Sequence, residues 1–310
     1  MTENALAGCT RAEVNASGHL PGAEPQVMRD NVGMSSRSES NWNSIIRANA
    51  SQKWRSQSAS MGSSMTQAIV EAARVEPGMR VLDVACGTGE PSISLAVGMR
   101  GSGEVTGIDI SSEPLKTAEE RAQERGLANV KFQLADVHSL PFANESFDRI
   151  TSRLGVMYFA ELPRALSEMW RVLKLGGTAT LLAWGPIEQP YFQTTIGTVL
   201  RFLPGAEAPE SGKKVFVFGE AGLLPQAFRN ARFTSVEERF VTLPYVWPGP
   251  PAEVWEYFQS VTVPFVTLLQ SIPEAIRPQI DQAVLHELER YYDGQETKLT
   301  ATVNITVAVK

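Results

Sequence analysis

A short apolar run, a glycine turn and the start of a helix constrain the fold of this chain more than any other segment. The run is Val81–Val84 (VLDV) and the turn is Ala85–Gly89 (ACGTG). So few apolar residues, bounded by a turn, indicate a buried strand rather than a helix. Gly87 and Gly89 allow backbone angles and a close approach that a Cβ would block. Open α/β sheets bind ligands at the carboxyl ends of such strands, where the N–H groups of the next helix are free.

The glycine spacing argues against two common nucleotide-binding loops. A dinucleotide fingerprint needs a third glycine where this chain has Ser92, and no Gly-Lys-Ser/Thr follows as in a P-loop. Val81–Gly89 instead resembles, without a gap, the first motif of class I S-adenosylmethionine (SAM) methyltransferases, [Val/Leu]-Leu-Asp-x-x-[Cys/Gly]-Gly-x-Gly. A generic glycine turn in an unrelated α/β domain is the alternative that the rest of the chain has to test.

Composition narrows the class of protein and its partners. The 310 residues are 43% hydrophobic, which is ample for one large or two small domains. The net charge is -6 and no long basic run occurs, so we expect no nucleic-acid partner. We also expect no membrane span and no secretory signal, because no long apolar run occurs. Two cysteines and three histidines predict neither a zinc cluster nor a disulfide framework, so we expect no metal and a cytoplasmic location.

The N-terminal part divides into two segments of different composition. Residues 1–40 contain no aromatic side chain and no isoleucine, so we expect a disordered tail. A lid or a targeting arm is the alternative for this tail, although its acidic residues are unlike a transit peptide. Residues 41–78 are expected to form two helices, because Met65, Ile69 and Ala72 share one face. In a methyltransferase these helices lie over the cofactor as a lid; plain packing helices are the alternative.

Two acidic residues follow later strands at positions suited to a nucleoside ligand. Asp109 ends the predicted strand 105–109, where an acid can accept hydrogen bonds from both ribose hydroxyls. Asp136 follows the predicted strand 130–134 and can accept from an adenine amino group while Val137 packs against the ring. Asp136–Phe142 (DVHSLPF) also resembles the family's Asp-x-x-x-Leu-Pro-Phe. His138 lies in this loop, and a histidine without chemical duty is the favoured interpretation.

The segment behind the predicted fourth strand faces the transferred methyl group in the family. It reads Thr151–Phe159 (TSRLGVMYF). Arg153 is a cation at a strand end, where it can contact a carboxylate bidentately. That carboxylate could belong to the methionine part of SAM or to an acidic substrate, and a structural salt bridge is the alternative. Tyr158 is a candidate for substrate contact, with a core position as the alternative.

The pattern of the remaining chain predicts the order of the other elements. Strand and helix alternate from 79 to 184, which implies parallel strands with helices on both faces. A helix over 162–173 is expected to end at Gly176-Gly177, and a fifth strand to follow at 178–184. Further expectations are helices near 191–203 and 223–230, a strand at 233–243, a turn between Pro244 and Gly249 over Tyr245 and Trp247, and helices within 245–295. Residues 299–309 alternate strictly, which indicates an antiparallel last strand.

Together these motifs resemble class I SAM methyltransferases over residues 79–184, with weaker agreement over 40–78 and 216–310. The resemblance implies an α/β fold with a Rossmann-like, seven-stranded sheet whose last strand is antiparallel. It implies a SAM-binding domain over 79–310 with cap insertions at about 185–215 and 245–295, SAM as the methyl donor, and a small-molecule acceptor. The cofactor-binding residues that it implies are Asp83, Ala85, Gly87, Thr88, Gly89, Asp109, Ile110, Asp136, Val137 and Arg153.

The acceptor is less constrained than the cofactor. Candidates for a general base are Tyr158, Tyr191, His138 and His286, and none of them is indispensable by pattern. The chain most resembles the small-molecule group that contains quinone-ring C-methyltransferases. That group carries Arg-Asn where this chain has Met157 and Tyr158, so we favour an apolar or aromatic acceptor from natural-product or secondary metabolism over a quinone.

Arsenite methylation is disfavoured, because Cys86 is the only cysteine in the part predicted to fold. Two function classes outside methyl transfer stay open at this point. One is a SAM-binding partner protein that has lost catalysis, and the other is a Rossmann oxidoreductase, which Ser92 disfavours.

Overall fold

A seven-stranded mixed sheet forms the centre of the computed structural model, which describes residues 53–310. The strand order is β3-β2-β1-β4-β5-β7-β6. The first five strands run parallel, whereas β7 runs antiparallel to both β5 and β6. The predicted α/β fold with an antiparallel last strand is therefore confirmed. The strands are β1 (Arg80–Val84), β2 (Glu104–Asp109), β3 (Val130–Leu134), β4 (Phe147–Arg153), β5 (Leu173–Trp184), β6 (Thr234–Trp247) and β7 (Thr297–Val309).

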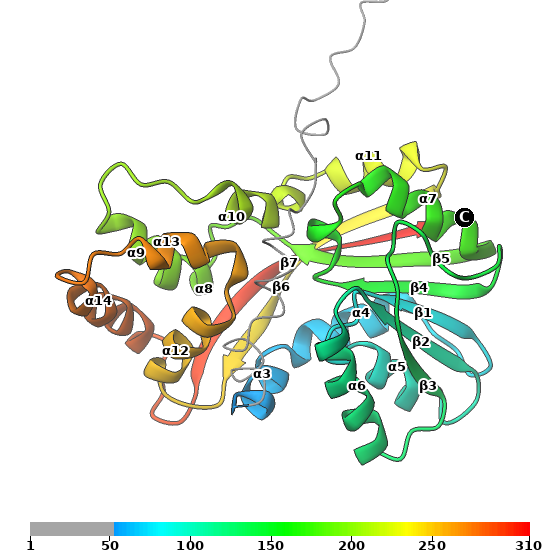
Figure 1. The fold of residues 1–310 in the computed structure, drawn as a ribbon, viewed down its shortest axis with the longest axis horizontal. Coiled ribbons are helices and arrows are strands. Elements are labelled where there is room, and N and C mark those ends of the chain that lie inside the picture. Colours follow the sequence, from blue (N-terminus) through cyan, green and yellow to red (C-terminus); the bar gives the residue numbers. More distant parts are fainter. Residues whose placement is uncertain (1–52) are drawn as a thin grey trace, which may run out of the picture. The chain divides into compact units, whose positions relative to one another are not determined.

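Helices cover both faces of the sheet (Figure 1). Helices α4, α5 and α6 lie on one face, and α7 and α11 lie together on the other. Helices α9, α12, α13 and α14 gather at the far ends of β6 and β7. The helices are α3 (Arg55–Met61), α4 (Ser63–Ala73), α5 (Ser92–Gly98), α6 (Ser112–Glu124), α7 (Leu162–Val172), α8 (Pro190–Phe192), α9 (Thr198–Arg201), α10 (Glu210–Val215), α11 (Leu223–Asn230), α12 (Pro251–Val261), α13 (Val266–Gln270) and α14 (Arg277–Glu289).

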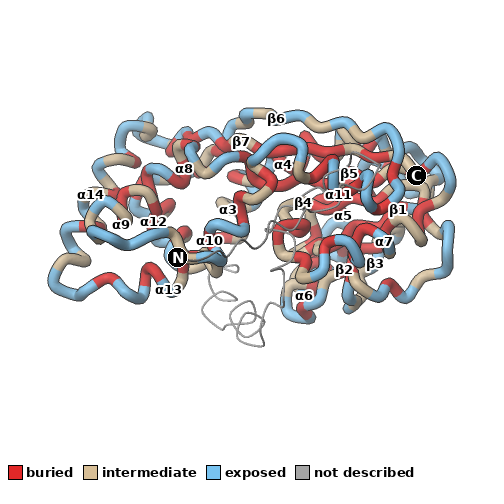
Figure 2. The backbone as a smooth tube through the Cα atoms, turned by 90° about the horizontal axis from the view of Figure 1, so that it is seen from above, coloured by how far each residue is buried: buried red, intermediate tan, exposed pale blue. Residues whose placement is uncertain are grey.

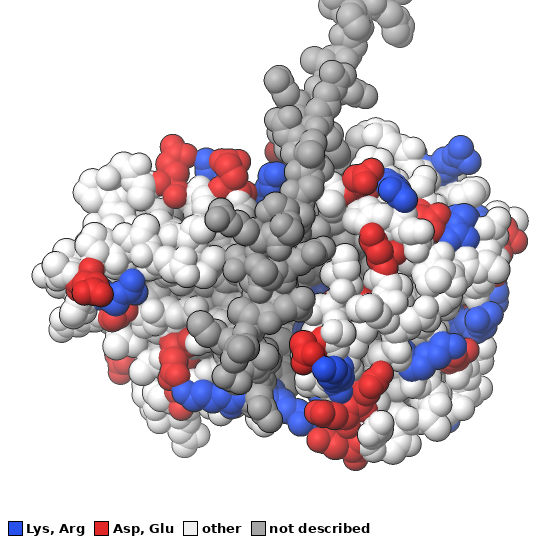
Figure 3. All heavy atoms as spheres, viewed as in Figure 1, with Lys and Arg blue, Asp and Glu red and all other residues white. Residues whose placement is uncertain are grey.

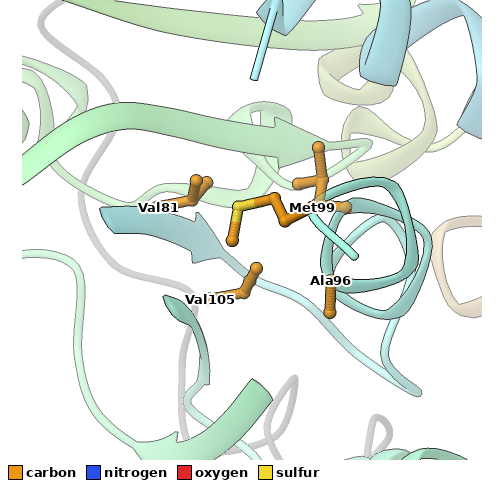
Figure 4. Packing of buried hydrophobic residues seen from close by; sticks show 5 residues of the cluster. Val81, Ala96, Met99 and Val105 are labelled. Carbon is orange, nitrogen blue, oxygen red and sulfur yellow. The ribbon is translucent and has the colours of Figure 1, made fainter. Parts of the chain in front are cut away.

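Parallel strands explain the apolar run that opens the sequence motif. Four of the five residues of β1 are buried, because helices cover both faces of a parallel sheet. Val81 on β1 and Val105 on β2 pack against Leu95, Ala96 and Met99 of α5, and all five are at most 1% exposed. Figure 4 shows Met99 reaching from α5 toward the two valines. This packing fixes the start of α5, and with it the glycine turn, against the end of β1.

Strands β6 and β7 form a ribbon that extends past the carboxyl end of β5 (Figure 1). Trp184, the last residue of β5, lies opposite Val303 of β7, which also pairs with Val241 of β6. Six further pairs continue the ribbon, from Thr242–Thr302 to Trp247–Thr297. Helices α12, α13 and α14 lie between the two strands in the sequence, at the far end of this ribbon.

The predicted turn over Tyr245 and Trp247 is wrong. Both residues belong to β6, and the chain turns only after Trp247, where Gly249 N–H donates to its carbonyl. Pro244 favoured a strand end because proline lacks an N–H for the ladder. Strand β6 is the edge of the sheet, where that loss is tolerated. Figure 2 shows how exposed the backbone of β6 is along most of its length.

The predicted end of the helix over 162–173 is also wrong. Helix α7 ends at Val172, and Leu173 is already extended and pairs with Phe147 of β4. Gly176 and Gly177 lie within β5 and exchange backbone hydrogen bonds with Lys310. The glycine pair therefore pairs with the residue that follows β7 rather than ending a helix.

The described range covers only part of the predicted N-terminal region. The predicted 1–40 tail and the first residues of the predicted helical segment 41–78 lie outside it, whereas α3 and α4 are two helices within the described part of that segment. Met65 and Ile69 of α4 are buried, as their shared face predicted. In residues 53–310, no helix combines the length and the apolar character that crossing a membrane requires.

We predict that Met99→Ala lowers the free energy of unfolding by about 2–5 kcal/mol, because it removes a buried side chain and leaves a cavity. Val97→Ala on the same helix is the matched control, since Val97 is 52% exposed, and we expect a change below about 1 kcal/mol. Urea denaturation of both variants measures the difference. Equal losses would show that α5 does not depend on this packing.

Candidate functional site

The strand order reverses between β1 and β4, and both strands end in strained backbone at that point. The chain leaves β1 toward β2 on one side, and it leaves β4 toward β5 on the other. Ala85 and Leu154 have φ of 56° and 58°, a left-handed conformation that is disfavoured for residues with a Cβ. Strain of this kind clusters at functional sites, and open α/β sheets bind ligands where the strand order reverses. The carboxyl ends of β1 and β4 are therefore the candidate site.

The glycine turn presents its backbone to open space. Gly87 has φ 54°, and a Cβ built there would meet no atom within 4 Å. Gly89 has φ 103°, and a Cβ there would lie 2.7 Å from Ile93 Cδ1. Gly89 thus lets the turn pack on α5, whereas Gly87 leaves open space beside the turn that a ligand can enter.

Asp83 lies beneath the turn and contacts only protein groups in the described chain. It is completely buried. The backbone N–H and hydroxyl of Ser92 donate to its Oδ2 at 3.0 and 2.5 Å, and the Thr151 hydroxyl donates to Oδ1 at 2.8 Å. Burial raises the pKa of Asp83 to about 6, although these hydrogen bonds oppose the rise. We assign Asp83 to the support of the turn rather than to ligand contact.

Asp109 is joined directly to the glycine turn. Its Oδ2 accepts the Gly87 N–H at 2.9 Å, and its Oδ1 accepts the Ser111 N–H at 2.9 Å. Each carboxylate oxygen thus accepts a backbone N–H, which fixes the orientation of the carboxylate at the end of β2. The structure therefore brings together two predicted site residues, Asp109 and Gly87, that are far apart in the sequence.

Arg121 is a residue of this site that the sequence analysis missed. It lies on α6 and is 8% exposed. Its Nη1 donates to the carbonyl of Thr88 at 2.6 Å, and its Nη2 pairs with Glu90 at 3.3 Å. Burial lowers the pKa of Arg121, although Glu90 opposes the decrease. Nothing in the sequence distinguishes Arg121 from other helical arginines, because only the packing of α6 brings it to the turn.

The predicted adenine-side residues occupy neighbouring strand ends. Asp109 of β2 pairs in register with Leu134 of β3, so the segments that follow these strands are adjacent. Ile110 is 62% exposed, and Asp136 is also exposed. Val137, by contrast, is buried at 7% exposure, so most of its side chain already packs against protein.

His138 uses both ring nitrogens within the protein. Its Nε2 accepts the Glu161 N–H at 3.1 Å, which assigns the ring proton to Nδ1, 2.6 Å from Asp136 Oδ1. Burial raises the pKa of Asp136, but hydrogen bonds from the His138 backbone and ring outweigh it, so the net pKa is lowered. His138 therefore positions the Asp136 loop, which matches the favoured interpretation of a histidine without chemical duty.

Arg153 extends from the end of β4 to the junction of α3 and α4. Its Nη1 donates to the Gly62 carbonyl at 3.3 Å and to Thr66 Oγ1 at 3.1 Å. Its Nε is buried and has no hydrogen-bond partner. Within residues 53–310 we find no carboxylate paired with Arg153, so the salt-bridge alternative is not seen there.

The structure separates the other candidates for a general base. Tyr158 lies in the 3-10 helix Val156–Tyr158, directly behind β4 at the reversal point. Tyr191 is buried among aromatic rings, and that burial raises the pKa of its phenol well above the usual value. His286 is exposed on α14, at the far end of the ribbon.

The face of the described surface in view carries charges of both signs. Figure 3 shows acidic and basic side chains interspersed across this face. No group of three or more His, Cys, Asp or Glu side chains within residues 53–310 is arranged to hold a metal ion. The expectations of no nucleic-acid partner and no metal stay predictions.

Comparison with known sequences identifies relatives. A family model described as a methyltransferase domain matches residues 75–184. An uncharacterized protein of Mycobacterium tuberculosis is 30% identical over 228 residues, which cover 70% of this chain and 81% of that protein. The demethylmenaquinone methyltransferase of Geobacillus kaustophilus is 36% identical over 140 residues, which cover 45% of this chain and 55% of that enzyme.

Comparison with solved structures supports the same fold. The YcgJ protein of Bacillus subtilis aligns with a TM-score of 0.51 at 20% identity, over 79% of this chain and 97% of that one. A SAM-dependent methyltransferase of Aquifex aeolicus aligns with a TM-score of 0.50 at 19% identity, over 64% of this chain and 92% of that one. Both similarities concern the arrangement of the sheet and its helices.

We predict that Asp83 makes the stability of this protein depend on pH. Because folding raises the pKa of Asp83 from 3.8 to about 6, its contribution to stability is full below pH 4 and is lost as the pH rises through 6. That difference corresponds to about 3 kcal/mol. In Asp83→Asn the free energy of unfolding should fall less between pH 4 and 7, by up to this amount.

Chemical denaturation of wild type and Asp83→Asn across this pH range makes the measurement. Asparagine can still accept from Ser92 and donate to Thr151, so the comparison isolates the charge. Parallel profiles would contradict the assignment of Asp83 as a buried acid.

Proposed function

Because the chain belongs to the class I SAM-dependent methyltransferases, we propose that it transfers the methyl group of SAM to an apolar or aromatic small molecule. The observation that carries this proposal is the strained backbone at the carboxyl ends of β1 and β4. There Asp109 holds the open turn at Gly87 in place. Membership of the family makes the protein an enzyme with SAM as methyl donor; the acceptor class and the site residues are our proposals.

The residues at the carboxyl ends of these strands match the parts of SAM in order along the sheet. We place the methionine part against Ala85–Gly89, where the space beside Gly87 is open. We place the ribose at Asp109, whose carboxylate is already held by two backbone N–H groups. The adenine would lie over Ile110, beside Asp136 and the edge of Val137, because an exposed isoleucine there offers an apolar surface.

The protein contributes chiefly alignment to this reaction. SAM supplies a methyl group on a positively charged sulfur, which is strongly activated toward nucleophiles. Holding two reactants in line can then supply roughly 7–11 kcal/mol in favourable cases. Fixed groups are needed for this purpose, and Asp83 and Arg121 fix the turn from below and from α6.

Among the four candidates for a general base, Tyr158 is the one that we retain. His138 has both ring nitrogens engaged, and His286 is exposed on α14. Burial raises the pKa of the Tyr191 phenol well above its usual value, so the phenolate, which is the form that accepts a proton, is disfavoured. Tyr158 lies beside the reversal point, within the segment that we expect to face the acceptor.

The aromatic residues at the far side of β5 and β6 suggest the acceptor class. Tyr191 packs with Tyr245 at a ring-centroid distance of 5.0 Å, and Trp184 packs with Tyr245 at 5.9 Å. Aromatic side chains favour aromatic or apolar ligands through area and ring geometry. We propose that residues 185–215 and 245–295 act as caps on this acceptor side, with α3 and α4 as a lid and 79–310 as the SAM-binding domain.

Binding and turnover test this function together. We expect SAM to bind in calorimetry while NAD and NADP do not, and labelled methyl to transfer from SAM to members of an acceptor panel with N, O and C nucleophiles. Binding of NAD or NADP in place of SAM would overturn the proposal. SAM binding with no transfer to any acceptor would favour the non-catalytic partner protein instead, and a demethylmenaquinone in the panel tests the quinone alternative.

We predict that Asp109→Asn weakens SAM binding about tenfold or more, because it removes a charged acceptor from the ribose position. Asp148→Asn is the matched control. Asp148 also accepts a backbone N–H, that of Arg80, but it lies at the opposite, amino-terminal ends of the central strands. We expect its affinity for SAM to stay within about twofold of wild type. Equal weakening in both variants would place Asp109 outside the cofactor site.

A further inference from the structure

One edge of the Arg153 guanidinium is not used by the described protein. The Nη1 group donates to the Gly62 carbonyl and to Thr66 Oγ1. The Nε group is buried without a partner, and none of the hydrogen bonds within residues 53–310 involves Nη2. Nε and Nη2 together form the side of a guanidinium that binds a carboxylate through two parallel hydrogen bonds. A buried, unpaired N–H is costly, so a ligand that accepts from Nε recovers that cost.

Arg153 also lies at the same end of the sheet as the aromatic residues of the ribbon, because it pairs with Leu182, two residues before Trp184. It is the last residue of β4, next to the strained Leu154. Tyr245 lies on the part of β6 that extends past the carboxyl end of β5. Burial raises the pKa of Tyr245 far above its usual value, and the positive charge of Arg153 opposes that rise.

The aromatic residues around Tyr245 form a continuous wall, which we call the Tyr245 cluster. Successive ring centroids lie 5.0 Å apart for Tyr245 and Tyr191, and 5.6 Å apart for Tyr191 and Phe258, in edge-to-face geometry. No hydrogen bond within the described chain involves the Tyr245 hydroxyl. The cluster consists of Trp184, Tyr191, Phe192, Tyr245 and Phe258.

The hydrogen-bond donors of Arg153 distinguish between two kinds of aromatic ligand. Aromatic rings also bind ammonium groups through cation–π contacts. An ammonium, however, offers no acceptor to the Nε and Nη2 groups, whereas a carboxylate can accept from both. These donors therefore favour a ligand that carries a carboxylate.

We infer that the methyl acceptor is an aromatic carboxylate, bound through its carboxylate by Nε and Nη2 of Arg153 and through its ring by the Tyr245 cluster. This inference rests on the proposed function and names the acceptor class of the same site. It assigns Arg153 to the acceptor rather than to the methionine carboxylate of SAM. Arg153 is then a specificity residue, and the Nη1 contacts to Gly62 and Thr66 hold it in place.

Binding of matched aromatic compounds tests the inference. The protein is saturated with S-adenosylhomocysteine and titrated with 4-hydroxybenzoate, 4-hydroxycinnamate and indole-3-acetate, each beside its primary amide, and with tyramine and tryptamine. We expect at least one acid to bind about tenfold or more tighter than its amide and than either amine. If every acid binds no better than its amide, or if an amine binds best, the inference is wrong.

Variants of Arg153 assign the effect to this side chain. Arg153→Gln should abolish the preference for acid over amide, and Arg153→Lys should keep only part of it, because an ammonium cannot form the two parallel bonds. Arg164→Gln is the matched control, since Arg164 is exposed on α7 and pairs only with Glu161 among the described acids. An unchanged preference in Arg153→Gln would overturn the inference.

The affinity for SAM separates the two carboxylates that Arg153 could bind. We expect Arg153→Gln to bind SAM within about threefold of wild type, and a loss of tenfold or more would place Arg153 on methionine and overturn the inference. Failure of wild type to bind SAM would instead refute the proposed function.

Tyr245→Phe keeps the ring and removes only the hydroxyl, so it tests the site if Arg153→Gln unfolds. We expect it to weaken acid binding about threefold or more with little change in thermal stability. Wild-type preference for acids in both Tyr245→Phe and Arg153→Lys would contradict the inference.

Discussion

The buried carboxylate of Asp83 is the interaction on which the candidate site depends. It joins three elements that must meet for the site to exist: the end of β1, the start of α5 through Ser92, and β4 through Thr151. A buried acid is costly to ionise, and its raised pKa reports that cost. The hydrogen bonds from Ser92 and Thr151 offset part of it. In return the glycine turn is held at one place against the strand that carries Arg153.

A second constraint divides the site into a cofactor side and an acceptor side. Hydrogen bonds from Asp109 and Arg121 hold the turn on the side of β2 and α6. On the other side of the reversal point, β6 and β7 continue past β5 and bring Tyr245 toward the end of β4. The parallel strands β1–β5 lie within residues 80–184, whereas the strands of the ribbon follow them in the sequence. Under our proposal, the choice of acceptor depends on the ribbon.

Strong local patterns predicted most of the sheet correctly. The turn at Gly87, the acid at Asp109 and the alternation in β7 are each governed by backbone geometry or by burial on one face, and such rules act over a few residues. The failures came where a neighbour in space overrides the local rule. Pro244 fits within β6 because that strand is an edge, and Gly176 lies within β5 because Lys310 pairs with it. Arg121 gave no signal, because an arginine on a helix acquires its role only from what the helix packs against.

The sequence alone was sufficient for the family and for the α/β sheet with an antiparallel last strand, because these follow from short motifs and from local hydrophobic patterns. Folding in three dimensions determined which of the predicted site residues are available to a ligand. Asp83 turned inward, His138 engaged both ring nitrogens, and Arg153 kept one edge of its guanidinium without a partner among residues 53–310. Availability depends on burial and on hydrogen-bond partners from distant segments. No local pattern contains that information, so it emerged only when the strands and helices were packed together.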